Sequence, residues 1–149
     1  MLDIEKLDKL IARLNSTGLV DPAYAKTRYR AHVEKATSKM LRSGQSFAVE
    51  SGGLAILNQT ESKFKTDVKA KNDDLDAQID IFNEALDLWF EHGEPHPPYY
   101  PWRIAVILSK AKRKDKEEAF LRAYSRHFKN RRGGARDEKI NARADKFGI

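Results

Sequence analysis

The sequence predicts an all-α protein of six or seven antiparallel helices, arranged as a bundle or a short α-solenoid. Apolar residues recur at steps of three and four through most of the chain, as they do along one face of an α-helix. Helix start and stop signals separate these segments, and no segment of any length alternates apolar and polar residues as a half-buried strand does. We expect the 149 residues to form a single domain, subdivided at 1–45, 73–128 and 129–149.

The segment 1–45 predicts an N-terminal pair of helices. The first covers about 3–15, with Asp3 as its candidate N-cap and with one apolar stripe formed by Leu2, Ile4, Leu7, Leu10, Ile11 and Leu14. Asp21-Pro22 starts the second helix, because proline is well tolerated at the first helical position, and Gly44 ends it after Arg42. We expect its inner face to carry Tyr29, Val33, Ala36 and Met40.

The segment 45–72 contains the weakest pattern. Ser51-Gly-Gly53 predicts a turn, because two glycines inside a helix cost about 2 kcal/mol relative to alanine. A third helix is expected over 54–71, with Leu54, Leu57, Phe64 and Val68 facing inward. The glycine pair lacks the strand and the Gly-Lys-Ser/Thr sequence of a phosphate-binding loop.

The helix expected over 74–92 has the clearest periodicity. Its buried face is predicted to consist of Leu75, Ile79, Phe82, Leu86 and Trp89. The acidic residues Asp76, Asp80, Asp87 and Glu91 lie off this row. Close carboxylates bind divalent ions or act in acid–base catalysis, but a row without a convergent partner motif is typical of a solvent-exposed face.

His92, Glu94 and His96 lie within five residues of one another. Imidazole and carboxylate groups are ordinary zinc ligands, so these three are the candidate metal ligands of the chain. A structural zinc site needs about four ligands, and only His32 and His127 occur elsewhere. The alternative is that His92 interacts with the dipole at the end of its helix, and our prediction includes no metal and no cofactor.

Four prolines between residues 95 and 101 predict an extended connector. Tyr99, Tyr100 and Trp102 follow on this stiff segment and are the candidate partner-binding residues, because exposed aromatic side chains bind extended peptides or stack on bases. The alternative is that they pack onto the neighbouring helices, and in that case Tyr99 or Tyr100 is expected to be the more exposed.

Three more helices are expected after the connector. Residues 102–108 are apolar nearly all round and predict a short buried helix. Asp115 and Glu118 predict a capping box for the next helix, whose buried face carries Phe120, Leu121, Tyr124 and Phe128. A basic glycine turn over 129–136 then leads to a final amphipathic stretch with Ile140, Ala144 and Phe147.

The unit from Trp102 to Phe128 resembles one helical hairpin of the tetratricopeptide (TPR) repeat type. A large aromatic residue opens its first helix, residues 112–119 stand where that family has its turn and small alanine, and aromatic residues follow. The family's glycine is replaced by Ile107 and Leu108, no proline closes the unit at Asn130, and no second copy follows at the period of about 34 residues. The resemblance therefore implies a TPR-like helical core within 73–128, and no binding residues.

The formal charge of +6 is distributed unevenly. Residues 1–71 carry a net +5, residues 72–102 a net −8 and residues 103–149 a net +9. Basic patches attract nucleic acid, since neutralising phosphates releases counterions, and oppositely charged segments can pair within or between copies; exposed helix faces are the alternative. The nucleic-acid candidates are Lys110, Lys112, Arg113, Lys114, Arg126, Arg131, Arg132 and Arg136.

The sequence leaves three functional hypotheses. The first is a non-enzymatic adaptor that binds a protein partner or itself, the second is a nucleic-acid-binding accessory protein, and the third is an enzyme. The absence of cysteine excludes thiolate chemistry, and no catalytic triad or small-molecule motif is visible. No apolar run approaches the roughly 18 residues of a membrane span, and no signal peptide is recognised, so we expect a cytoplasmic protein without membrane contact.

Overall fold

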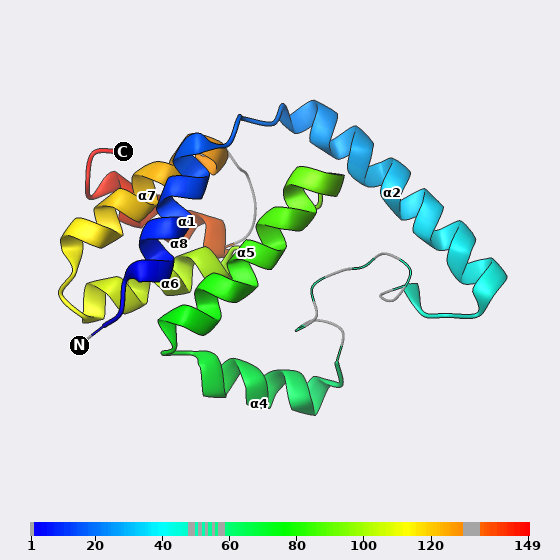
Figure 1. Ribbon diagram of the computed structural model, residues 1–149, viewed down its shortest axis with the longest axis horizontal. Coiled ribbons are helices and arrows are strands. Elements are labelled where there is room, and N and C mark those ends of the chain that lie inside the picture. Colours follow the sequence, from blue (N-terminus) through cyan, green and yellow to red (C-terminus); the bar gives the residue numbers. More distant parts are fainter. Residues whose placement is uncertain are drawn as a thin grey trace. The chain divides into compact units, whose positions relative to one another are not determined.

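The computed structural model describes residues 2–47, 59–129 and 135–149, together with Glu50, Gly52, Leu54 and Ile56, and excludes the side chains of Ala135 and Arg136. The described residues form helices and connecting segments without any strand, so the predicted all-α class is confirmed. The helices are α1 (Glu5–Ser16), α2 (Pro22–Ser43), α4 (Glu61–Lys71), α5 (Leu75–His92), α6 (Tyr99–Lys110), α7 (Lys114–Phe128) and α8 (Ala135–Asp145) (Figure 1).

These helices separate into two compact units. The first unit contains Met1–Leu19, Lys71–Asn83 and Pro97–Ile149, and the second contains Val20–Ala70 and Glu84–His96. Helix α5 therefore contributes its first half to one unit and its second half to the other. Three of the four breaks between the units fall inside the segments 1–45 and 73–128 that the sequence suggested, and the fourth falls between Ala70 and Lys71.

The first unit has a dense apolar core. Helix α7 packs against α1, α6 and α8, and α6 also packs against α8 (Figure 1). The Phe82 ring lies edge-on to Phe120, with 6.2 Å between ring centroids, and 6.0 Å from the ring of Tyr124. Other side chains of this unit with almost no exposure are Leu7, Leu10, Leu14, Ile79, Ile104, Leu108, Leu121 and Ile140. Full burial of one such side chain stabilises a fold by about 1.5–3 kcal/mol, so this core carries the stability of the first unit.

Helix α2 of the second unit begins and ends as predicted. The Asp21 carboxylate accepts a hydrogen bond from the Ala23 N–H at 3.3 Å, and Pro22 occupies the first helical position. Gly44 ends the helix with a φ of +72°, a left-handed conformation that glycine adopts at no steric cost.

The face of α2 predicted to be buried is only partly so. Ala25 and Ala36 are its buried residues, whereas Tyr29, Val33 and Met40 remain half-exposed. A 22-residue helix thus anchors itself in the second unit mainly through two small side chains.

The second half of α5 is closely packed against α2. Gly93 follows α5 with a φ of +71°, and a Cβ atom at this position would lie 2.2 Å from the Ala25 carbonyl oxygen. The Arg28 guanidinium donates hydrogen bonds to the Phe90 and Glu91 carbonyl oxygens at the end of α5. The backbones of α2 and α5 therefore meet at a position where only glycine fits.

The predicted helix over 54–71 is wrong in its first half. Helix α4 begins only at Glu61, after the Thr60 hydroxyl accepts the Lys63 N–H at 3.4 Å. The Gln59 side chain donates to the Ile56 carbonyl oxygen at 2.8 Å, and such local bonds compete with helix formation. Leu54 is buried, Phe64 and Val68 are half-buried, and Leu57 lies outside the described residues.

Two expectations for the C-terminal helices are also wrong. Helix α6 begins at Tyr99 instead of Trp102, because Pro101 lies in its first turn, where a missing N–H leaves no helical bond unmade. Asp115 does not form a capping box, since both of its carboxylate oxygens accept hydrogen bonds from Arg113 at 3.0 Å. The predicted buried face of α7 is confirmed.

Candidate interaction surface

The three aromatic candidates are mostly packed against the first unit. Tyr100 is only 3% exposed, so the expectation that Tyr99 or Tyr100 would be the more exposed is wrong for Tyr100. The Tyr99 hydroxyl donates to Asn72 Oδ1 at 2.5 Å, and the half-buried Trp102 ring lies 5.3 Å from the Lys139 ammonium group. Tyr99 and Trp102 retain some exposed surface, and their role in partner binding stays a prediction.

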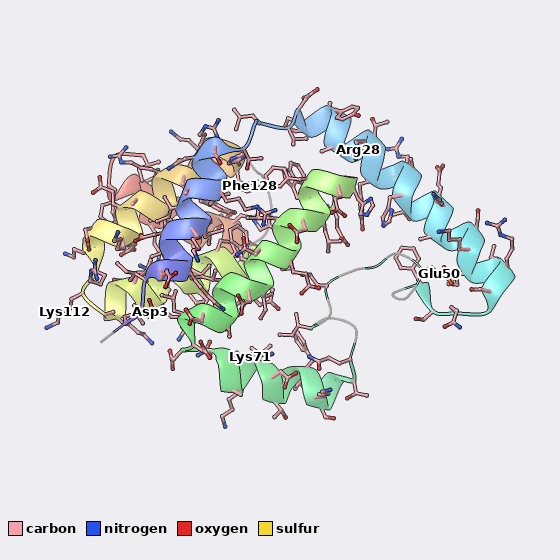
Figure 2. The ribbon with its side chains drawn as sticks, viewed as in Figure 1. Asp3, Arg28, Glu50, Lys71, Lys112 and Phe128 are labelled. Atoms are coloured by element: carbon pink, nitrogen blue, oxygen red, sulfur yellow. The ribbon has the colours of Figure 1, made fainter. Side chains whose placement is uncertain are left out.

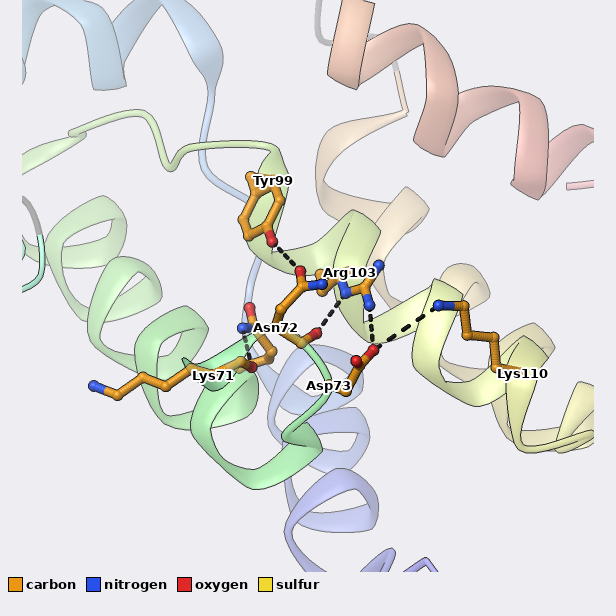
Figure 3. A network of polar contacts seen from close by, with 7 residues as sticks. Lys71, Asn72, Asp73, Tyr99, Arg103 and Lys110 are labelled. Carbon is orange, nitrogen blue, oxygen red and sulfur yellow. Dashed lines mark hydrogen bonds and ion pairs between the residues drawn. The ribbon is translucent and has the colours of Figure 1, made fainter. Parts of the chain in front are cut away.

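A polar network holds the turn before α5 against α6 (Figure 3). Buried Arg103 donates to the Asn72 carbonyl oxygen and to the Asp73 carboxylate, and the Lys110 ammonium group lies 3.9 Å from the same carboxylate. The Gln78 side-chain amide donates to the Lys71 carbonyl oxygen at 2.8 Å. Arg103 therefore has a structural role in the first unit.

Several cations predicted to bind nucleic acid also have partners inside the first unit. Arg126 donates to the carbonyl oxygens of Leu14 and Thr17, at 2.8 and 2.9 Å, and so satisfies acceptors at the end of α1. The Arg113 guanidinium holds the pKa of the Asp115 carboxyl at about 2.

The remaining nucleic-acid candidates differ in what the structure shows of them. Lys112 and Lys114 are exposed. Arg131, Arg132 and the side chain of Arg136 lie outside the described residues.

The metal-ligand candidates all belong to the second unit. The His92 ring stacks on His32 with 3.9 Å between centroids, and burial, followed by the nearby charge of His32, lowers the pKa of His92. Burial raises the pKa of the Glu94 carboxyl, and burial together with Glu94 raises the pKa of the Tyr29 hydroxyl. His96 is buried. In the described part of the chain, no three His, Cys, Asp or Glu side chains are grouped so that they could hold a metal ion.

The exposed face of α2 carries an unpaired set of cations. Helix α2 has six Lys or Arg residues against Glu34 alone, and one of the six, Arg28, is half-buried and bonds to the Phe90 carbonyl oxygen of α5 (Figure 2). The other five cations are exposed, and among the described residues none of them lies within ion-pair distance of a carboxylate; they are Lys26, Arg30, Lys35, Lys39 and Arg42. Tyr24 and Leu41, exposed by 58% and 77%, lie on the same helix. We call the exposed side of α2, from Ala23 to Arg42, the α2 face.

Sequence reasoning did not single out the α2 face, although a signal was present. The net charge of +5 over residues 1–71 comes from α2, because the charges in the rest of this segment cancel. Summation over each expected helix would have identified α2 as the most basic one. It would not have shown which cations are paired, because the acids that pair with them are far away in sequence, as Asp8 is from Lys116.

No protein-family model, curated protein or solved structure matches this chain. Within the described residues, none of the helices combines the length and the apolar character needed to cross a membrane.

Proposed function

We propose that this chain is a non-enzymatic, cytoplasmic interaction protein in which the first unit is a scaffold and the α2 face contacts the partner. The observation that supports this proposal is the set of five exposed α2 cations without a carboxylate partner among the described residues. In the proposed scaffold, helices α6 and α7, which are joined by three residues, form the TPR-like hairpin.

The stability of the protein does not account for this set of charges. Two like-charged pairs at a spacing of four residues, Lys26 with Arg30 and Lys35 with Lys39, each destabilise a helix by about 0.2–0.5 kcal/mol. Arg30 and Glu34, the one oppositely charged pair at this spacing, offset only part of that loss. In the first unit, by contrast, several cations are placed opposite acids, as Lys116 is opposite Asp8 and Arg143 opposite Glu117. A charged helix face that weakens its own helix is explained by a partner that supplies the opposite charge.

Catalysis has no part in the proposal. His127, one of the histidines considered for an enzyme, has its Nε2 atom 2.7 Å from the Leu14 carbonyl oxygen in the first unit, whereas His92 and His96 belong to the second. We therefore assign these three histidines a role in the fold of their own units.

Lysine cross-linking in cells tests the proposal. Formaldehyde, which joins lysine amines to the amino groups of proteins and of DNA bases, should join Lys26, Lys35 and Lys39 to a partner more often than the exposed first-unit lysines Lys114, Lys129 and Lys146. Dividing cross-links by dead-end modifications at each lysine corrects for chemical reactivity. Intermolecular cross-links spread evenly over both groups, or confined to the first unit, would contradict the proposal.

A further inference from the structure

We propose that the α2 face binds double-stranded DNA, with α2 lying in the major groove and its cations contacting the phosphates on both sides. This inference rests on the proposed function, because it assigns the chemistry of the partner to the same face.

The arrangement of residues around α2 supports a groove. Helix α2 has 22 residues and is therefore about 33 Å long. Opposite the buried residues Ala25 and Ala36 lies a row of exposed residues, which consists of Ala23, Thr27, Ala31, Glu34, Ser38 and Leu41. Four of these six side chains are no larger than that of threonine, so a surface could approach the helix closely along most of this row.

The unpaired cations lie on the two flanks of this row. At about 100° per residue, Lys26 and Arg30 fall on one flank, and Lys35, Lys39 and Arg42 fall on the other. The major groove of B-form DNA is about 12 Å wide, admits an α-helix and has a phosphate backbone on each side. Cations on both flanks of a small-residue row match that geometry and charge.

The same placement disfavours an anionic membrane. A helix that lies on a bilayer turns a continuous apolar face toward the lipid. The apolar face of α2, which carries Tyr29, Val33 and Met40, is instead turned partly into the protein, on the same side as Ala36. The major groove of double-stranded RNA is too narrow to admit a helix, so a helix with cations on both flanks fits DNA better than RNA.

Glu34 is the one carboxylate on the α2 face and lies within the exposed row. A carboxylate near phosphates weakens binding to most sequences, although it can accept a hydrogen bond from the cytosine amino group. We therefore expect E34Q to bind mixed-sequence DNA several-fold more tightly than the natural chain.

The test is fluorescence anisotropy with the full chain and a labelled mixed-sequence DNA duplex of roughly 20 base pairs, two helical turns. Five phosphate contacts predict a slope of about −4.5 for the logarithm of affinity against that of salt, a loss of roughly 500-fold between about 50 and 200 mM. The variant K35A/K39A/R42A leaves two phosphate contacts, so its salt slope should flatten to about −1.8. K26A/R30A, on the opposite flank, should also weaken binding, and circular dichroism checks that both variants fold.

The matched control is K114A/K129A/K146A, which removes the same three charges from exposed positions of the first unit. It should bind DNA within about threefold of the natural chain, because its lysines make no phosphate contact in this arrangement. The variant R131A/R132A/R136A tests the basic C-terminal region in the same assay, and it too should retain binding.

Four results would overturn the inference. They are no binding at low salt, equal weakening by the two matched triple variants, loss of binding in the C-terminal variant alone, and tighter binding to double-stranded RNA or phosphatidylserine vesicles than to DNA. If DNA does not bind while cross-links to a protein partner still concentrate on α2, the inference fails and the proposed function stands. If neither occurs, both fail.

Discussion

The two units of this protein use their basic residues in different ways. In the first unit, many cations pair with acids on other helices, as Lys6 does with Asp80 and Lys116 with Asp8, or bond to the end of a helix, as Arg126 does. Its exposed lysines without such a partner among the described residues are not gathered along one helix; they include Lys112, Lys114, Lys129 and Lys146. In the second unit, the cations of α2 other than Arg28 lie on an exposed face without such partners among the described residues. Net charge alone therefore does not locate a binding surface, whereas several unpaired cations gathered on one helix indicate one.

The units also differ in how they bury apolar side chains. The first unit encloses Phe82, Phe120 and Tyr124 almost completely. In the second, α2 buries two alanines and α4 has no buried residue. The larger apolar side chains that the second unit buries are aliphatic: Leu54, Ile56, Leu86 and Leu88. The first unit should therefore supply most of the free energy of unfolding, and the second unit should be the easier one to open.

The largest expected effect concerns the core of the first unit. Phe120→Ala should lower the free energy of unfolding by about 3–5 kcal/mol, because it leaves a cavity among side chains that have no access to water. Tyr24→Ala on the α2 face should change it by less than about 0.5 kcal/mol. Urea denaturation followed by circular dichroism measures both, and similar losses would remove the contrast between the units.

The next effect concerns the α2–α5 contact of the second unit. Gly93→Ala should cost about 2–4 kcal/mol, because it combines a left-handed backbone with a clash against the Ala25 carbonyl oxygen. Gly44→Ala is the matched control, since Gly44 has almost the same φ, +72°, and open space around it. It should cost only about 1–2 kcal/mol. Equal losses, compared by urea denaturation, would mean that close packing at Gly93 contributes nothing.

Removing one arginine from each unit shows how much a paired and an unpaired cation contribute to stability. Arg103→Ala should destabilise the protein by about 1–3 kcal/mol, because the bonds to Asn72 and Asp73 are lost. Arg42→Ala should have an effect below about 0.5 kcal/mol. Thermal unfolding of both variants checks this, and a destabilising Arg42→Ala would show that the α2 cations have a structural role.

A smaller effect should appear in the dependence of stability on pH. The pKa of His92 is lowered in the fold by burial and by the charge of His32, so the unfolded chain binds the proton more readily. The contribution of neutral His92 to the free energy of unfolding is fully present above the ordinary histidine pKa of about 6.5. It is lost as the pH falls from there toward the lowered pKa of His92 in the fold. The raised pKa of Glu94 acts in the opposite direction, since its destabilisation at higher pH is relieved on acidification.

The variant His92→Gln should therefore lose less stability than the natural chain between about pH 7.5 and 5.5, the range around the ordinary histidine pKa. Thermal unfolding at both pH values measures the difference. His127, whose pKa is also lowered by burial, provides the comparison in the first unit through His127→Gln. An unchanged pH dependence in His92→Gln would contradict the assignment.

The smallest effect concerns the turn between α6 and α7. Lys112 has a φ of +58°, in the left-handed region where a side chain is strained. Lys112→Gly should stabilise the protein by about 0.5 kcal/mol, because the relief of backbone strain exceeds the cost of glycine's greater freedom in the unfolded chain. Lys114→Gly, inside the first turn of α7, should destabilise it instead. A loss of stability in Lys112→Gly would show that the side chain contributes more than the strain costs.

Much of the fold could be predicted from the sequence because its signals are local. The stripe of Leu7, Leu10 and Leu14, the cap at Asp21 and the stop at Gly44 all depend on residues a few positions apart. The start of α4 could not be predicted, because competing side-chain bonds before Glu61 replace its first turns.

The candidate site depended on tertiary structure and was harder to predict. Burial of Tyr100 follows from the helices packed around it, and the ion pair between Lys116 and Asp8 joins residues 108 positions apart. Only after such pairs are assigned do the unpaired cations of α2 stand out.

Hydrogen exchange followed by mass spectrometry tests the contrast between the two units most directly. We expect amides of α6 and α7 to exchange only on global unfolding, and amides of α2 and α4 to exchange much faster through local opening. Protection of α2 and α4 equal to that of α7 in the free protein would contradict this contrast, because the second unit would then be as firmly closed as the first.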